Sequence, residues 1–134
     1  MARLVLGIGC ERGTDEGLLE RGIEKVLAEH ALPASAVCAL ATLESKHDEA
    51  GLLALAQRRG WPLTFYSVHQ LAAVSVQGSE LVSRSVGTPA VAEPAARLRA
   101  GRHELTVPKT IHREPGVSGS MTIAIATESE GSHG

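Results

Sequence analysis

Apolar and polar residues alternate along the chain in blocks typical of an α/β protein. Three short segments, 3–9 (RLVLGIG), 36–42 (AVCALAT) and 63–66 (LTFY), are almost continuously apolar, as expected of strands that are covered on both faces. Between them, residues 15–32 and 45–59 place apolar side chains at helical spacing. This order predicts parallel strands joined by helices that cover the sheet.

The C-terminal half continues the pattern with a change of direction. Two prolines interrupt the segment 87–101, so we expect a regular helix to begin near Glu93. Segments 103–109 (HELTVPK) and 121–127 (MTIAIAT) predict two more strands. The residues between these two strands show no helical pattern, whereas a parallel crossover needs a helix. The pair is therefore predicted to be an antiparallel hairpin at the edge of the sheet.

Short polar residues in front of two helical segments predict where helices begin. Ser45 and Asp48 resemble a capping box, and Ser67 and Gln70 have its full spacing. We therefore expect one helix to start at Ser45 and a single helical turn to start at Ser67.

Together these elements predict a single three-layer α/β/α domain over residues 1–127, with a mostly parallel sheet and an antiparallel C-terminal edge hairpin. Residues 128–134 (ESEGSHG) are polar and are expected to form a disordered tail. Ligands of such folds bind outside the carboxyl ends of the strands. That rule places four loops on one rim: 9–14 (GCERGT), 43–49 (LESKHDE), 85–93 (SVGTPAVAE) and 107–120 (VPKTIHREPGVSGS).

Composition narrows the classes of partner. The 134 residues carry a net charge of −2 and only one Trp, one Tyr and one Phe, so neither charge nor stacking favours a nucleic-acid partner. No apolar run is long enough to cross a membrane, and the N-terminus does not resemble a signal peptide. Two cysteines do not make a disulfide framework. We therefore expect a cytoplasmic protein without a membrane partner.

The segment 7–14, GIGCERGT, joins the first strand to the first helix. Its glycines are spaced one residue too widely for the dinucleotide fingerprint. A glycine-rich turn of this kind lets backbone amides approach an anion, although glycines also simply permit a tight turn. Cys10 lies near a helix N-terminus with Arg12 close by, a setting that lowers a thiol pKa and suits a nucleophile. The alternative, which we favour, is that Cys10 is a small half-buried packing residue.

Two further loops carry cations. Lys46 and His47 precede acidic residues, and His47 is a candidate general acid or base, although a solvated helix start explains the same residues. Lys109, His112 and Arg113 form a second basic group. The spacing of histidines, cysteines and acids matches no metal motif, so we expect no metal site, and no cofactor is implied. The residues thus predict a rim of amides and cations that suits an anionic ligand.

At these residues the chain resembles a known family. The segments GIGCERGT, LESKHDEAGLLALA, VGTPAVAEPAA, LTVPK and TIAIA resemble, in this order, the CobE family, which also forms the C-terminal domain of CbiG. The resemblance runs from about Leu4 to Thr127, with departures at KHDE and IHREPGVSGSM. It implies a role in cobalamin (vitamin B12) biosynthesis, in the construction of the corrin ring.

The resemblance implies two alternative functions. One is to bind an anionic precorrin or cobalt-precorrin intermediate, as a carrier or accessory factor for other corrin-pathway enzymes. The other is to open the ring lactone of cobalt-precorrin-5A with release of acetaldehyde, as the hydrolase or a subunit of it. We favour binding, because no Ser-His-Asp pattern appears. The candidate catalytic residues are Cys10, His47 and Glu49, and the candidate ligand-binding residues are Gly9, Cys10, Arg12, Gly13, Thr14, Lys46, His47, Gly87, Thr88, Val91, Glu93 and Lys109.

Overall fold

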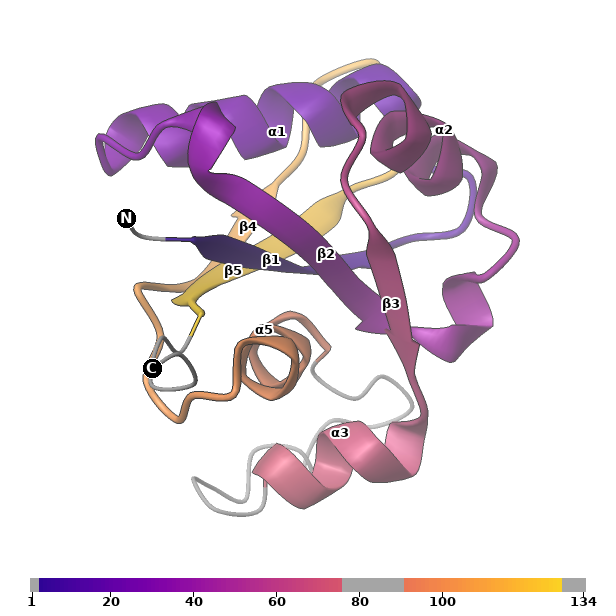
Figure 1. Cartoon of the computed structure of the whole chain (residues 1–134). Helices are drawn as coiled ribbons and strands as arrows, with labels where there is room; N and C mark the ends of the chain where they lie inside the picture. Colours follow the sequence, from indigo (N-terminus) through magenta and orange to yellow (C-terminus); the bar gives the residue numbers. More distant parts are fainter. Residues whose placement is uncertain (1–2, 76–90, 129–134) are drawn as a thin grey trace.

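Five strands form one mixed sheet in the order β3-β2-β1-β5-β4 in the computed structural model, which describes residues 3–75 and 91–128 (Figure 1). The strands are β1 (Leu4–Cys10), β2 (Val37–Leu43), β3 (Leu63–Tyr66), β4 (Val107–His112) and β5 (Met121–Thr127). β1 pairs in parallel with β2, and β2 with β3, whereas β5 is antiparallel to both of its neighbours. Four strands therefore run in one direction and β5 alone is reversed. The predicted mostly parallel sheet and its C-terminal hairpin are confirmed.

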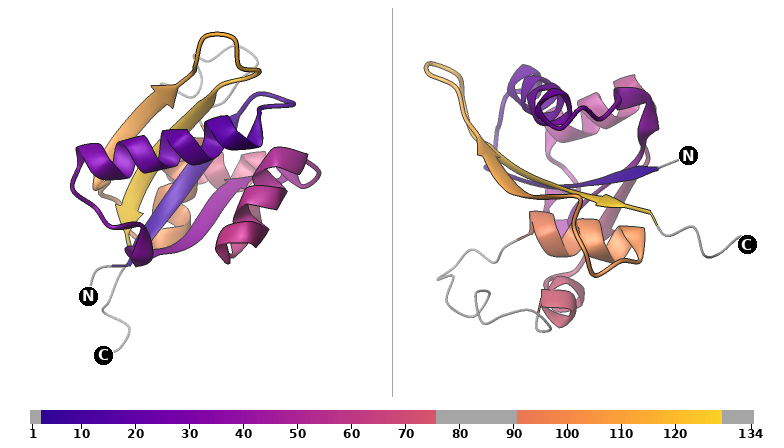
Figure 2. Two further views of the ribbon diagram at one scale, coloured as in Figure 1. Left: turned by 90° about the horizontal axis from the view of Figure 1, so that it is seen from above. Right: turned by 90° about the vertical axis from the view of Figure 1, so that its left-hand side faces the viewer.

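Helices cover both faces of this sheet. On one face lie α1 (Glu16–Glu29) and α2 (Ala50–Arg59), and on the other lies α5 (Ala92–Ala100), with α3 (Val68–Ser75) packed on α5 (Figure 2). Two short 3-10 turns, Ala34–Ala36 and Glu44–Lys46, stand before and after β2. The predicted three-layer α/β/α architecture is confirmed.

The two faces of the sheet are packed differently. Leu6 and Ile8 of β1 are fully buried toward α1 and α2 in a core of large side chains. The alternate positions of the same strand, which are Val5, Gly7 and Gly9, face α5 and are smaller. A Cβ at Gly7 would overlap the carbonyl oxygen of Ala92, so glycine is what lets α5 approach β1 so closely. On this face, buried alanines replace the leucines and isoleucines of the other.

The helix α2 begins later than its sequence predicts. It starts at Ala50 with Glu49 as the residue before it, and Ser45 belongs to the preceding 3-10 turn. The expected capping box of Ser45 and Asp48 is therefore wrong. The reason is a contact that local spacing cannot show, because the Asp48 carboxylate accepts a hydrogen bond from Arg12 instead.

The helix α3 begins as predicted but is longer. The Ser67 N–H donates to Gln70 Oε1 at 2.8 Å, and the Gln70 N–H donates to Ser67 Oγ at 3.0 Å, which confirms the capping box. The helix then continues to Ser75, beyond the single turn that we expected. The rest of the segment without a clear sequence pattern lies outside the described residues.

The chain end stays in contact with the sheet as far as Glu128. Its N–H donates to the Arg3 carbonyl at 2.7 Å, and its carboxylate pairs with Arg3 at 3.0 Å and with Arg99 at 3.3 Å. Glu128, which the sequence assigned to the tail, thus packs with the domain, and the tail from 129 onward lies outside the described residues.

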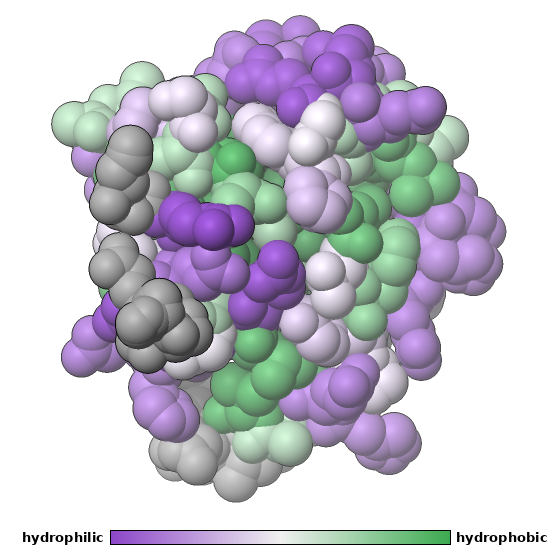
Figure 3. All heavy atoms as spheres, viewed as in Figure 1, coloured by the Kyte–Doolittle hydropathy of each residue, from purple (hydrophilic) through white to green (hydrophobic). Residues whose placement is uncertain are grey.

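Charged residues cover the outer side of α1, which lies uppermost in Figure 3. Arg58 and Arg59 of α2 pair there with acidic residues of α1, among them Glu20. Within the ranges that the structure covers, no helix is both long and apolar enough to cross a membrane.

Candidate functional site

Three loops meet at the edge of the sheet where the parallel strands end. They follow β1, β2 and β4, and two backbone hydrogen bonds join the first loop to the third. The Glu11 N–H donates to the Ser120 carbonyl at 3.1 Å, and the Asp15 N–H donates to the Ser118 carbonyl at 3.0 Å. We call this the carboxyl edge. Of the fourth predicted loop only 91–93 is described, so the candidates Gly87 and Thr88 lie outside the described residues.

Glu49 holds the first two loops together. Its side chain is only 3% exposed, and its two oxygens have different donors. The Gly13 N–H donates to Oε2 at 2.8 Å, and Arg12 Nη1 donates to Oε1 at 3.2 Å. The predicted catalytic acid therefore has both oxygens engaged within the protein.

Arg12 is a second link between these loops. Its Nη1 also donates to Asp48 Oδ1 at 2.8 Å, and its Nη2 donates to the Ser45 carbonyl at 2.9 Å. The hydrogen bond between the two side chains raises the pKa of the Arg12 guanidinium and lowers the pKa of the Asp48 carboxyl. The Arg12 side chain nevertheless stays 58% exposed. Asp48 and Ser45 are contacts that sequence reasoning missed.

The backbone amides of the glycine-rich loop are less available than we expected. Besides the amides of Glu11, Gly13 and Asp15, the Thr14 N–H also has an acceptor, the Glu11 carbonyl at 3.2 Å. Thr14 is buried, and its hydroxyl donates to the same carbonyl at 2.7 Å. These four amides all have acceptors within the protein, so side chains are the better candidates for contact with an anion.

Cys10 ends β1 and is half-buried against the core beneath α1 and α2. Burial raises the pKa of its thiol, and this effect exceeds the opposing influence of the positive charges of Lys46 and Arg12. The expectation that its setting lowers the pKa was wrong, because that setting is less hydrated than its sequence neighbours indicate. The structure is consistent with Cys10 as a packing residue.

The second loop presents Lys46 and His47. Lys46 ends the 3-10 turn and is half-buried, and its charge acts on the Cys10 thiol. His47 is exposed, with Nδ1 at 3.1 Å from the Glu44 carbonyl oxygen. The structure thus brings Cys10, Arg12, Lys46 and Glu49 into one neighbourhood.

A half-buried apolar surface lies on the α5 side of the sheet, at the same edge. Leu43, Tyr66 and Val91 pack around the small core between β2, α3 and α5. Gly9 adjoins them, since a Cβ built there would stand 3.6 Å from Val91 Cβ, an ordinary contact. Packing therefore does not demand a glycine at this position, in contrast to Gly7.

Two other candidates lie apart from the cluster. The Lys109 N–H on β4 donates to Glu93 Oε2 at 2.9 Å, so Glu93 joins α5 to the edge strand. β4 stands three strand spacings from β2, which is roughly 14 Å. Lys109 therefore lies apart from Lys46 and within the edge strand itself, since the strand predicted over 103–109 runs over Val107–His112 and the rim loop begins only after it.

An ionic cluster at the end of β4 was not anticipated. His112 Nε2 lies 2.8 Å from Glu114 Oε2, and Arg21 Nη2 of α1 lies 2.7 Å from Glu114 Oε1. These hydrogen bonds lower the pKa of the Glu114 carboxyl to about 2, and the bond from Arg21 has the larger effect. Gly22 makes room for this contact, because a Cβ there would stand 2.8 Å from His112 Cδ2. The close spacing of His112 and Glu114 was the only signal in the sequence.

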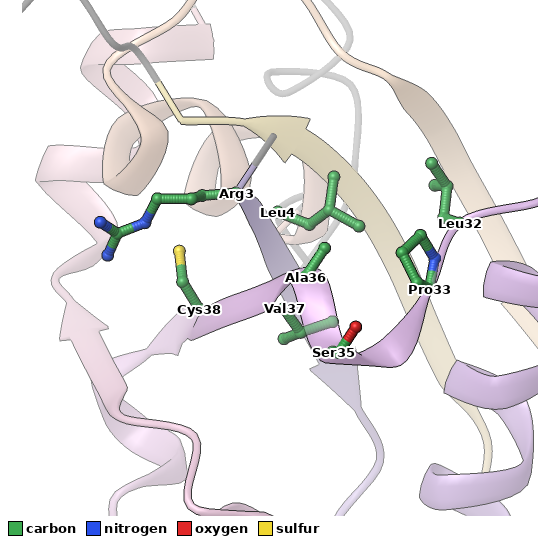
Figure 4. Close-up of a pocket in the computed structure, with 8 residues that line it drawn as sticks. All are labelled: Arg3, Leu4, Leu32, Pro33, Ser35, Ala36, Val37 and Cys38. Carbon is green, nitrogen blue, oxygen red and sulfur yellow. The ribbon is translucent and has the colours of Figure 1, made fainter. Parts of the chain in front are cut away.

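The structure also has a hollow at the opposite edge, where β1 and β2 begin (Figure 4). Its volume is about 450 Å³. Cys38 and Arg3 stand at one end, and Cys38 Sγ is 3.8 Å from Glu128 Oε1. Leu32 and Pro33 stand at the other end. The lining residues are Arg3, Leu4, Leu32, Pro33, Ser35, Ala36, Val37 and Cys38, none of which was a candidate site residue.

No group of three or more histidine, cysteine or acidic side chains that could hold a metal ion occurs in 3–75 and 91–128. The chemistry that these ranges offer is recognition of an anion by cationic side chains next to an apolar surface. The fold and this edge together define a three-layer α/β domain whose loops gather at the carboxyl ends of its strands.

Comparison with known proteins assigns this domain to a family. Residues 4–126 match the family described as Cobalamin synthesis G C-terminus, and the chain belongs to it. It is 40% identical over 124 residues to the cobalt-precorrin-5A hydrolase of Priestia megaterium, a match that covers 92% of this chain and 32% of that protein. It is 34% identical over 128 residues to Protein CobE of a Sinorhizobium species, covering 93% and 80%.

Solved structures agree with this assignment. The crystal structure of CobE, a protein from the cobalamin biosynthetic pathway, has a TM-score of 0.71 at 31% identity and covers 96% of this chain and 94% of that one. The cobalamin biosynthesis protein chiG from Agrobacterium tumefaciens gives 0.71 at 29% identity, covering 95% and 99%. The predicted family is thus confirmed, and the chain is a cobalamin biosynthesis protein. It spans about a third of the Priestia hydrolase.

Proposed function

We propose that the chain binds an anionic tetrapyrrole intermediate, a precorrin or cobalt-precorrin, at its carboxyl edge. In this role it acts as a carrier or accessory factor for other enzymes of the corrin pathway. The observation that supports this proposal is that the half-buried apolar surface of Gly9, Leu43 and Val91 lies at the same edge as the cationic side chains of Lys46 and Arg12.

A ring rimmed with carboxylates needs both kinds of surface. Its flat face gains from contact with apolar side chains, and its carboxylates need partners in exchange for water. Gly9 leaves the end of β1 without a side chain where packing would have allowed one, which gives a flat ligand closer access to the backbone. Single exposed ion pairs contribute little, so tight binding would depend on several contacts made together.

The alternative is that the chain hydrolyses the ring lactone, alone or as a subunit. The name of the Priestia relative supports it, although this chain spans only a third of that protein. Hydrolysis needs an activated nucleophile or water. Of the three candidates, Glu49 has both oxygens engaged, Cys10 has a raised thiol pKa and His47 contacts the Glu44 carbonyl. These contacts favour binding over hydrolysis by this chain alone.

The two cysteines of the chain offer a direct test, because they lie on opposite edges of the sheet. Cys38→Ala leaves only Cys10, and Cys10→Ala leaves only Cys38. The rate of thiol alkylation of each variant would be measured with and without uroporphyrin, a stable porphyrin with carboxylate side chains. We expect the porphyrin to slow alkylation at Cys10 several-fold and to leave Cys38 unchanged. The protection should weaken as salt screens the charges.

Charge reversal supplies the matched control. Lys46→Glu should reduce the protection of Cys10, whereas Arg102→Glu makes the same charge change just beyond the C-terminal end of α5 and should not. Arg58 and Arg59 are unsuitable controls, because both pair with acids of α1. Protection of Cys38 alone would place the ligand in the opposite hollow and overturn the proposal. Release of acetaldehyde from cobalt-precorrin-5A by the isolated chain would instead support the hydrolase.

A further inference from the structure

We infer that Arg12 is a carboxylate subsite of the proposed ligand site, and that the carboxylate of Asp48 fills this subsite until the ligand replaces it. The inference rests on the proposed function, because it needs a ligand that carries carboxylates. It begins from the three acceptors around the Arg12 guanidinium, which are Asp48 Oδ1, Glu49 Oε1 and the Ser45 carbonyl.

These acceptors differ in how easily they can leave. Glu49 is 3% exposed and also accepts from the Gly13 N–H, so its position is fixed by the loop. The Ser45 carbonyl belongs to the backbone of the 3-10 turn. Asp48 is 60% exposed, and its contact with Arg12 is a hydrogen bond between two exposed side chains. Only Asp48 can rotate into water without loss of a buried contact.

The arrangement defines what a ligand would gain at this point. Its carboxylate would accept from Arg12 Nη1 in place of Asp48, while Glu49 and the Ser45 carbonyl keep the guanidinium oriented. Asp48 therefore competes with the ligand. The apparent affinity for the ligand is the intrinsic affinity multiplied by the fraction of molecules in which Arg12 is not bound to Asp48.

Such competition selects between ligands. A ligand with one carboxylate at Arg12 and another near Lys46 replaces the hydrogen bond between Arg12 and Asp48 and adds an ion pair with Lys46. A ligand without a carboxylate at Arg12 leaves the pair of Arg12 and Asp48 intact and gains nothing there. Arg12 thus favours tetrapyrroles with many carboxylates, and Asp48 reduces this preference, because it competes only with ligands that place a carboxylate at Arg12.

The test removes the competitor and compares it with a neutral control. Asp48→Asn removes the negative charge and leaves Arg12 only a weaker amide acceptor, and Asp48→Ser, whose side chain is shorter, removes the carboxylate altogether. Glu44→Gln removes one negative charge from the same exposed loop without touching the contacts of Arg12. Binding of uroporphyrin to each full chain would be titrated at low and moderate salt, and thermal unfolding would confirm that each variant folds.

We expect Asp48→Asn to tighten binding roughly two- to five-fold, and Glu44→Gln to change it by clearly less. In an Arg12→Gln background, the additional Asp48→Asn change should have no more effect than Glu44→Gln. If wild type binds uroporphyrin and Asp48→Asn binds it no more tightly than Glu44→Gln, the subsite is wrong while the proposed function stands. Weaker binding of Asp48→Asn would overturn the subsite too. If no variant binds uroporphyrin, the proposed function fails and the inference with it.

Discussion

The two edges of the sheet differ in where their polar groups are used. At the carboxyl edge the loops after β1, β2 and β4 bond to one another, and the buried Glu49 carboxylate stands at their centre. At the opposite edge a hollow of about 450 Å³ opens between mostly apolar side chains, and Glu128 pairs with an Arg3 side chain that is 63% exposed. A cluster of glycines and charged residues in a sequence can therefore serve to hold neighbouring loops together, and not only to bind a ligand.

Because the carboxyl edge is held by these contacts, substitutions there should lower stability far more than similar substitutions elsewhere. The largest effect is expected for Gly119→Ala. Gly119 has φ +90°, and a Cβ there would stand 2.5 Å from Thr14 Cα and 2.7 Å from Thr14 Cβ. Both the backbone strain and the overlap oppose the change, so we expect a loss of roughly 3 kcal/mol in the free energy of unfolding, measured with urea.

Gly116 in the same loop is the matched control. Its φ of +74° is also positive, but a Cβ there would meet nothing within 4 Å. Gly116→Ala should therefore cost only the strain of the left-handed conformation, about 1 kcal/mol. Equal losses for the two variants would mean that contact with Thr14 does not hold the loops together.

The second expected effect compares two carboxylates. Glu49→Ala removes the acceptor of the Gly13 N–H at a buried position, and we expect a loss of about 2 kcal/mol. Glu128→Ala removes the ion pairs of the opposite edge, where Arg3 is 63% exposed, and should cost less than about 1 kcal/mol. Chemical denaturation of both variants at one pH would measure the difference. A smaller loss for Glu49→Ala than for Glu128→Ala would contradict the comparison.

Much of the fold could be predicted because its signals are local. The apolar runs give the strands, and the missing helix between 109 and 121 gives the antiparallel hairpin. The capping box of Ser67 and Gln70 is complete within four residues, and the structure confirms it. The predicted start of α2 was wrong for the opposite reason, since Asp48 accepts a hydrogen bond from Arg12, which is 36 positions away in the sequence.

The candidate site was predictable to the same extent. The strand order places Arg12, Lys46 and Cys10 at one edge, as the sequence predicted. Sequence could not show that Thr14 is buried under Gly119, or that the loop amides find acceptors in the protein. The pKa of Cys10 was predicted in the wrong direction for a related reason, because the charges near it can be read from the sequence but its burial cannot.

The smallest expected effect concerns the ionic cluster of Glu114, and it appears only in acid. Arg21 and His112 lower the pKa of Glu114 in the folded protein to about 2, against 4.5 for an ordinary glutamate. A depressed pKa means that ionised Glu114 stabilises the fold above about pH 4.5, and that this contribution is lost as the pH falls toward about 2. Glu114→Gln lacks the contribution, so its urea midpoint should fall less steeply than that of wild type over this range. Arg21→Gln should have a similar effect, because it removes the main cause of the lowered pKa of Glu114.

Arg97→Gln is the matched control. Arg97 donates to the His103 carbonyl instead, so this variant should keep the steep wild-type profile of urea midpoint against pH. If Arg21→Gln and Arg97→Gln gave the same profile, the pair of Arg21 and Glu114 would not be what secures this loop to α1.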